Sequence, residues 1–290
     1  MLAINNLSFS YRRKAPMVLD NYNLKIEKGT ICGLLGPNGT GKSTLLYLIA
    51  GLLKPTSGNI DYNGFNPHDR KVDFLNDIFI VPEEFSLPPI SIEDFIKANA
   101  QFYPKFSRDD FEKFLAIFEM GHDLNLDRLS MGQKKRVFLS FALACNTSLL
   151  LLDEPTNGLD IPGKRCFRKA VLESMTDDRI IIISTHQVYD VDRILDHIIV
   201  ASPGKVLLNA DMRSISRQLS FSFSPDRNRS QLALLSLEAP GGYHIVELAD
   251  SDAEETDVNL ETLFELAINR PELIAQLGLA PASSLHSSQN

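Results

Sequence analysis

Short apolar runs alternate with helical patterns along most of the chain. The apolar runs, which read as buried strands, cover residues 31–35, 78–81, 148–153 and 179–184. Short strands that are apolar throughout are typical of parallel sheets covered on both faces by helices. The pattern therefore predicts an α/β fold built around such a sheet.

The N-terminal segment has a different pattern. AINNLSFSY (3–11) and VLDNYNLKI (18–26) alternate between apolar and polar residues, with the polar bend RRKAP between them. Strict alternation favours strands with one buried face. We expect a small antiparallel β subdomain here.

Residues 91–120 are helical in character and lie in a predicted helical subdomain of about 85–145. Two Ser-x-x-Asp patterns indicate helix starts, Ser91 with Asp94 and Ser107 with Asp110. Gly121 is a natural stop.

The C-terminal third has weaker signals. Residues 219–224 and 243–248 alternate like strands, and Pro240, Gly241 and Gly242 form a turn between them. One helical face then collects Leu260, Leu263, Phe264, Ala267 and Ile268. We expect a small α+β accessory domain over 206–279 and a disordered tail over 280–290. The acidic run 250–257 reads as a solvated loop rather than a metal site.

Composition limits the function classes. The 290 residues are 44% hydrophobic and 23% charged, with a net charge of -8, as in ordinary globular proteins. The acidic balance argues against general nucleic-acid binding. Cys32, Cys145 and Cys166 have no metal-ligand spacing and read as buried apolar residues in a reducing compartment. No secretory signal or run of about 20 apolar residues is apparent, so a cytoplasmic location is expected.

Candidate chemistry begins after the run 31–35, where the chain matches GxxxxGK[ST]. The loop comprises Gly36, Pro37, Asn38, Gly39, Thr40, Gly41, Lys42, Ser43 and Thr44. Glycines let successive N–H groups face a phosphate, and the following helix adds the positive end of its dipole. Lys42 is expected on the β- and γ-phosphates and the Ser43 hydroxyl on Mg²⁺.

A second element ends the run 148–153. Asp153 and Glu154 follow it directly, and open α/β sheets bind ligands at the carboxyl ends of their strands. We expect Asp153 to hold Mg²⁺ and Glu154 to orient the attacking water.

A third element is a helix start with a Ser-x-x-Gln spacing. It contains Ser130, Met131, Gly132 and Gln133. The simplest interpretation is a well-capped helix. A Ser–Gly helix start is also an anion site, which raises the possibility that both starts serve the same phosphates across a subunit interface.

Together these motifs resemble the ATP-binding-cassette family over residues 1–205. The family signature is usually LSGGQ, here LSMGQ. The resemblance implies a head-to-tail dimer in which Ser130 and Gly132 of one chain close on the γ-phosphate held by Lys42 of the other.

Three further assignments come from the same resemblance. The segment 157–160, which ends at Asp160, resembles the loop that links the two sites, and His186 resembles the switch histidine that contacts the γ-phosphate. Tyr11 resembles the aromatic residue that stacks on adenine, with Phe9 close to it.

The chain departs from the family pattern in three places. Met131 replaces the first signature glycine, so its side chain must point away from the phosphate. Glu83 stands where a glutamine usually senses Mg²⁺ and couples to the membrane partner. Its carboxylate is still expected to bind the metal, while adding negative charge near the γ-phosphate, and the departure favours export. Asn157-Gly158 stands where Ser-Ala is commoner.

The resemblance therefore implies a Mg²⁺-dependent ATPase that powers a transporter. Its partners would be a second ATPase subunit, identical or related, and a permease on a separate chain that holds it at the inner face of the cell membrane. The alternative is a soluble cassette ATPase of cluster assembly, translation or DNA maintenance. Translation-type proteins usually carry two cassettes and DNA-maintenance ones long coiled coils, and neither is visible here.

Overall fold

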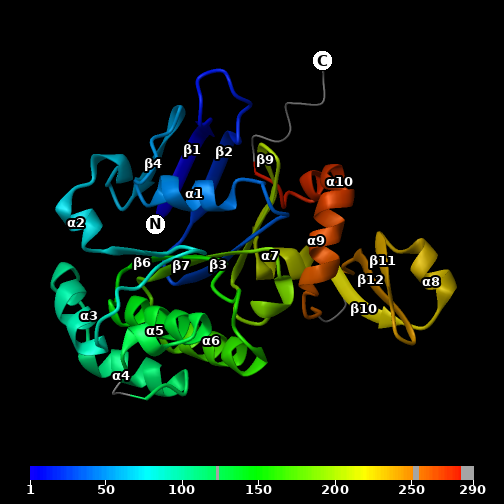
Figure 1. The fold of residues 1–290 in the computed structure, drawn as a ribbon. Helices are drawn as coiled ribbons and strands as arrows, with labels where there is room; N and C mark the ends of the chain where they lie inside the picture. Colours follow the sequence, from blue (N-terminus) through cyan, green and yellow to red (C-terminus); the bar gives the residue numbers. More distant parts are fainter. Residues whose placement is uncertain (122–123, 251–254, 282–290) are drawn as a thin grey trace.

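The computed structural model describes residues 1–121, 124–250 and 255–281. A mostly parallel sheet lies at its centre (Figure 1), in the order β5-β6-β7-β3-β8-β9. Its strands are β3 (Thr30–Leu35), β5 (Ile78–Val81), β6 (Leu149–Asp153), β7 (Ile180–Thr185), β8 (His197–Ser202) and β9 (Lys205–Asp211), of which β9 is antiparallel to β8. The prediction of a parallel sheet is confirmed.

The two faces of this sheet have separate hydrophobic cores, because successive strand residues point to opposite faces. On one face, Leu149 and Leu151 pack with the apolar residues of α1 (Lys42–Ile49). On the other face, Leu150 and Leu152 pack against the helical layer. Figure 1 shows α1 on one side of the sheet and α5 and α6 on the other.

The N-terminal sheet covers the α1 side. It consists of β1 (Leu2–Phe9), β2 (Leu19–Ile26) and β4 (Ser57–Tyr62), all antiparallel. The antiparallel β1–β2 pair was expected, but β4 was not. Next come the 3₁₀ helix Pro67–Asp69 and α2 (Val72–Leu75).

The helical layer comprises α3 (Ile92–Asn99), α4 (Arg108–Ile117), α5 (Met131–Ala144), α6 (Ile161–Glu173) and the 3₁₀ helices Ala100–Phe102 and Leu126–Arg128. Ser91 and Ser107 accept hydrogen bonds from the N–H groups of Asp94 and Asp110, as predicted. Gly121 is not the stop. The helix ends at Ile117, and Glu119 takes the left-handed conformation with φ 57°.

The C-terminal part packs against the same core as the helical layer. Its elements are α7 (Met212–Gln218), β10 (Leu219–Ser224), α8 (Arg227–Leu232), β11 (Leu235–Ala239), β12 (Gly242–Leu248), α9 (Leu260–Asn269) and α10 (Pro271–Gln276). The strands form a sheet in the order β10-β12-β11, and α9 buries Leu260, Leu263 and Ala267 as predicted.

The expected domain boundary at residue 205 falls where β9, the edge strand of the central sheet, begins. The division into domains stays a prediction. Residues 251–254 of the acidic run and residues 282–290 of the expected disordered tail lie outside the described residues.

All three cysteines are buried, as expected. In the part of the chain that the structure describes, no helix is long and apolar enough to cross a membrane.

Candidate active site

The loop after β3 is shaped by glycine. Gly41, immediately before α1, has φ 91°, a conformation that other residues rarely adopt. A Cβ on Gly36 would lie 2.6 Å from the carbonyl oxygen of Ala201. The backbone therefore turns tightly between strand and helix, and no side chain caps the start of α1.

Lys42 is the first residue of α1, and its side chain is buried at the inner edge of this loop. Its Nζ donates to the carbonyl oxygens of Gly36 (2.8 Å) and Pro37 (3.2 Å). It also lies 3.8 Å from Glu154 Oε1. Burial lowers the pKa of Lys42, while the carboxylates of Glu154, Asp153 and Glu83 oppose the shift. The loop and the predicted acidic residues thus converge on one ammonium group.

β6 delivers Asp153 and Glu154 to the same end of the sheet, and both are buried. The Ser184 hydroxyl, at the end of neighbouring β7, donates to Asp153 Oδ1. His186 follows β7, and its N–H donates to Glu154 Oε1 at 3.1 Å while its Nδ1 lies 2.8 Å from the same oxygen. Glu154 is therefore held from one side by His186 and faced from another by Lys42.

The second oxygen of Glu154 has no such partner. Oε2 is buried, and it makes no hydrogen bond within the described residues. Glu154 also has φ 44°, an uncommon conformation for a residue with a side chain. Because a buried carboxylate oxygen without a partner is costly, this atom is suited to a small polar group such as water.

Tyr11 lies beside the beginning of α1. Its hydroxyl is 2.9 Å from Thr44 Oγ1 and its side chain is 61% exposed. Phe9 is buried and contacts the Tyr11 ring edge to face, with 4.9 Å between the centroids. Of these two aromatic residues, Tyr11 is the one whose ring is accessible to a base.

The second helix start forms a complete capping box. The N–H of Gln133 donates to Ser130 Oγ (3.3 Å), and the N–H of Ser130 donates to Gln133 Oε1 (3.0 Å). Met131 is 62% exposed, so its side chain leaves the helix start open. A Cβ on Gly132 would lie 3.0 Å from the carbonyl oxygen of Gly158. The structure therefore places this start beside the segment after Glu154, on the face of the sheet opposite α1.

Glu83 and Asp160 have partners of their own. Glu83 Oε1 accepts from Asn157 Nδ2 at 2.9 Å. Asp160 caps α6, accepting from the N–H of Gly163 and from Arg136. Those contacts, the first of them foremost, lower the pKa of Asp160.

Sequence reasoning missed several residues that hold the site together. Ser184 binds Asp153, and Lys135 donates from α5 to the carbonyl oxygens of Glu154 (2.9 Å) and Asn157 (3.0 Å). Asn157 was noted as a departure from the family pattern, but its hydrogen bond to Glu83 was not expected. Lys135 carries a sequence signal, since it shares a helical face with the buried Leu139 and Ala142.

Comparisons with known proteins agree with this geometry. Residues 19–157 match the family model described as ABC transporter. The energy-coupling factor transporter ATP-binding protein EcfA2 of Spiroplasma kunkelii is 30% identical over 287 residues, covering 92% of this chain and 90% of that protein. The chain belongs to the ABC transporter family. A second relative, the zinc uptake system ATP-binding protein ZurA of Listeria monocytogenes, is 32% identical and covers 69% of this chain and 81% of its own.

Solved structures give the same result. A cbiO1 protein from Clostridium perfringens, part of the ABC transporter complex cbiONQ, has a TM-score of 0.61 and 30% identity, covering 72% of this chain and 88% of that chain. A dimeric ATP-binding cassette bound to ADP and phosphate in a post-hydrolysis state has a TM-score of 0.64 and 25% identity. The match covers 73% of this chain and 98% of that chain.

The predictions of family, fold class and ATPase activity are confirmed. This ABC transporter protein is an ATP-binding and ATP-hydrolysing subunit. Because one relative carries the name of an uptake system, the exporter-like interpretation of Glu83 stays a prediction.

Proposed function

We propose that two such subunits, copies of this chain or this chain and a related ATPase, close around two ATP molecules and thereby drive a permease on a separate chain. The permease would hold the ATPase at the inner face of the cell membrane. Each ATP would lie between Lys42 of one subunit and the Ser130–Gly132 helix start of the other.

The observation that carries this proposal is the position of the two helix starts. α1 packs on one face of the central sheet and α5 on the other. Both starts are suited to anions, but they belong to helices on opposite faces of the sheet. This arrangement favours a second chain as the source of the start that closes on the phosphate.

The residues around Lys42 can carry hydrolysis. Glu154 Oε2, buried and without a hydrogen bond in the described structure, would accept a hydrogen bond from the attacking water. His186 keeps the other oxygen in place through contacts of 2.8 and 3.1 Å. Lys42 and the loop N–H groups would hold the phosphates.

The same site offers a fitting set of Mg²⁺ ligands. Mg²⁺ usually binds through one or two carboxylates, waters and substrate phosphates. Asp153 and the Ser43 hydroxyl would hold it, with Glu83 close enough to influence Lys42 electrostatically. When bound, the ion would neutralise charge on the phosphates.

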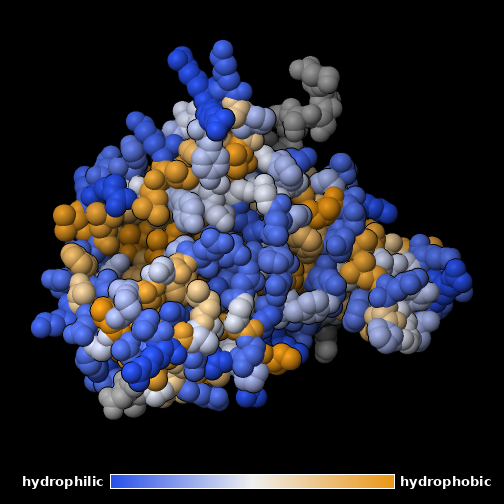
Figure 2. All heavy atoms as spheres, in the orientation of Figure 1, coloured by the Kyte–Doolittle hydropathy of each residue, from blue (hydrophilic) through white to orange (hydrophobic). Residues whose placement is uncertain are grey.

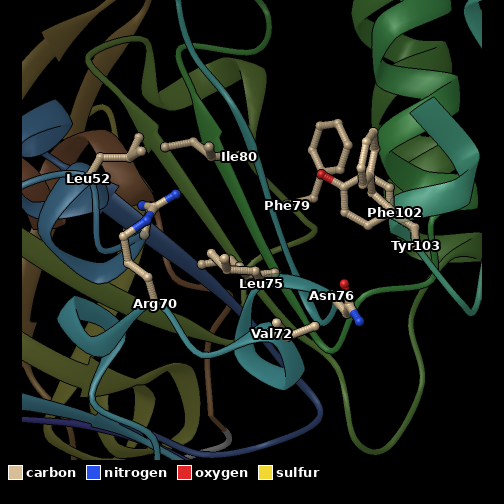
Figure 3. A pocket seen from close by; sticks show the side chains of 11 residues that line it. Leu52, Arg70, Val72, Leu75, Asn76, Phe79, Ile80, Phe102 and Tyr103 are labelled. Carbon is tan, nitrogen blue, oxygen red and sulfur yellow. The ribbon is translucent and has the colours of Figure 1, made fainter. Parts of the chain in front are cut away.

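An apolar groove gives the permease a place to dock. A cavity of about 460 Å³ lies between the end of α1, the α2 region and the helical layer. Figure 3 shows Leu52, Val72 and Leu75 on one side and Phe102 and Tyr103 on the other. Leu52, Val72 and Phe102 are 54%, 69% and 61% exposed, and Figure 2 shows hydrophobic residues gathered on this face. Because β5 lines the groove and leads to Glu83, a permease segment seated there would contact the chain next to the ATP site.

The dimer is tested with Glu154→Gln, which keeps the side-chain shape and removes the charge. We expect ATP turnover to fall about 10²–10⁴-fold and the ATP-loaded variant to elute as a dimer in size-exclusion chromatography with light scattering. Glu173→Gln, the same change on the surface of α6, should neither lower ATP turnover nor trap an ATP-loaded dimer. A Glu154→Gln protein that stays monomeric with saturating ATP would refute the shared sites.

The groove is tested with Val72→Asp. Val72 is largely exposed, so the change should leave the fold and the ATPase activity of the isolated subunit intact. We expect it to abolish recovery of a polytopic membrane protein in a detergent pull-down from native membranes. Leu232→Asp, at an apolar residue of α8 that is even more exposed, is the control. Recovery of soluble partners alone with the unmodified chain would favour the non-transport class.

A further inference from the structure

Lys135 is a buried lysine to which the mechanism above gives no role. It lies in α5 and is 3% exposed. Its ammonium group donates to the carbonyl oxygens of Glu154 at 2.9 Å and Asn157 at 3.0 Å. Burying a charge is costly unless it is paired and hydrogen-bonded. These two hydrogen bonds explain how the ammonium group of Lys135 can lie in the core.

The surroundings of Lys135 are those of the ATP site itself. Burial lowers its pKa, and the carboxylates of Glu83, Glu154 and Asp153 oppose this shift. The same three carboxylates act on Lys42, so both lysines lie in the field of one acidic cluster. The ammonium therefore joins α5 to the acidic side of the site.

The segment that Lys135 holds reaches the other catalytic groups. Glu154, at one end, accepts from His186. Asn157, at the other end, donates to Glu83 (2.9 Å) and accepts from Gln187 Nε2 (3.3 Å). Fixing both carbonyl groups thus fixes the backbone from which Glu154 and Asn157 make these contacts.

We propose that Lys135 is a positioning residue that couples the two ATP sites of the dimer. This inference rests on the shared sites proposed above. Ser130, at the start of α5, serves the ATP held by the other subunit, while Lys135, further along the same helix, holds Glu154 at the chain's own ATP. Closure of Ser130 on one ATP therefore moves the backbone of Glu154 at the other.

A second close approach joins α5 to the segment after Glu154. The backbone of Gly132 lies so close to the carbonyl oxygen of Gly158 that an added Cβ would be 3.0 Å from it. The start of α5 is therefore packed near the segment after Glu154. Packed interiors transmit such displacements because they contain little free space. Lys135 and Gly132 therefore give α5 two places of close approach to this segment.

Lys135→Met tests the coupling. Met has a similar length and no donor, so it removes both hydrogen bonds without a large change of volume. We expect the wild-type ATPase rate to rise cooperatively with ATP, with a Hill coefficient above 1. In the variant, kcat should fall about tenfold, which corresponds to about 1.4 kcal/mol, the KM for ATP should stay within twofold, and the Hill coefficient should approach 1.

Two further variants separate positioning from stability. Lys169→Met, at an exposed lysine of α6, should leave all three parameters unchanged. Lys135→Gln keeps an N–H donor, so its kcat should lie between wild type and Lys135→Met, and it answers the same question if the Met variant does not fold. A loss of kcat accompanied by an equal rise of KM and a matching fall of Tm would reduce Lys135 to a structural residue and overturn the proposal.

The experiments distinguish a failure of the coupling through Lys135 from a failure of the shared ATP sites. If Glu154→Gln forms an ATP-dependent dimer while Lys135→Met retains wild-type kcat and cooperativity, only the coupling is refuted. A wild-type enzyme that hydrolyses ATP without cooperativity refutes the coupling as well. If Glu154→Gln stays monomeric, the shared sites are refuted, and the coupling with them.

Discussion

α1 and α5 both begin beside a glycine and a hydroxyl residue, but they satisfy their first N–H groups differently. α1 follows Gly41 in the left-handed conformation and has no side-chain cap. α5 follows Ser130 and has a full capping box with Gln133. The first N–H groups of a helix need partners from outside its own turns. Those of α1 are left for water or a bound anion, whereas α5 has a capping box made by its own side chains.

The two starts also share a feature that sets them apart from the other α-helices that the structure describes. Neither has an acidic residue as its N-cap or in its first turn, whereas α6, α7 and α8 have an aspartate N-cap. By contrast, α3 begins with Glu93 and Asp94, and α4 with Asp109 and Asp110. Acidic side chains at a helix start are stabilising because they face the positive end of the dipole. Their absence from α1 and α5 leaves that potential available to phosphate.

The comparison indicates an order of events. In the proposed dimer, the α1 start would bind nucleotide in a single subunit, because its loop and Lys42 are already in position. The α5 start is capped by its own side chains and would meet phosphate only when another subunit brings one. Variants at each start should therefore fail at different stages.

Lys42→Ala should have the largest effect. It removes a buried cation from the phosphate loop, and hydrogen bonds to charged groups contribute about 1.5–3 kcal/mol. We expect the Kd for ATP to rise about 100-fold, measured by titration calorimetry on the monomer. Lys169→Ala, an exposed lysine of α6, is the matched control. An unchanged Kd would show that α1 does not hold the nucleotide.

Ser130→Arg should act at the later stage. The arginine side chain would fill the α5 start, so hydrolysis should fall at least ~10-fold, as when a group that contacts the transition state is lost. The Kd for ATP in the monomer should stay within twofold. Ser107→Arg, which removes the comparable cap of α4, controls for loss of the cap itself. A matching loss of hydrolysis in both variants would erase the distinction between the two starts.

Much of this fold follows from local sequence. The apolar runs gave the strands of the parallel sheet, and both Ser-x-x-Asp patterns gave true helix starts. The end of α1 could not be predicted from local sequence. The apolar run after Thr44 continues to residue 53, yet the helix ends at Ile49. Gly51 takes φ 68°, and a Cβ there would lie 2.2 Å from the carbonyl oxygen of Pro67. That approach involves a residue distant in sequence.

The site, like the fold, could be predicted only in part. The phosphate loop, Asp153 and Glu154 carry their chemistry in contiguous motifs. The bond from Ser184 to Asp153 and the contact of Asn157 with Glu83 join separate strands and loops, so no single segment reveals them. Lys135 could have been noticed as a charge on an apolar helical face, but its acceptors are backbone groups that only the fold brings near.

Gln133→Leu should have the smallest effect and gives the finest test of the comparison. Leu has a helix propensity close to that of Gln, so the change removes mainly the acceptor for the N–H of Ser130. Half of the capping box is lost, which should cost about 1 kcal/mol and lower Tm by about 2–4 °C, measured by calorimetry without nucleotide.

This last result separates a cap that stabilises the free subunit from one that also serves ATP. Gln218→Leu, at the exposed end of α7, should leave Tm unchanged. If α5 depends on its cap only until it meets phosphate, the Tm deficit of Gln133→Leu should shrink in an ATP-loaded dimer trapped by Glu154→Gln, because phosphate then partners the first N–H groups. A deficit that is the same in the trapped dimer would mean that the α5 start keeps its own cap throughout, and that Ser130 contacts no phosphate.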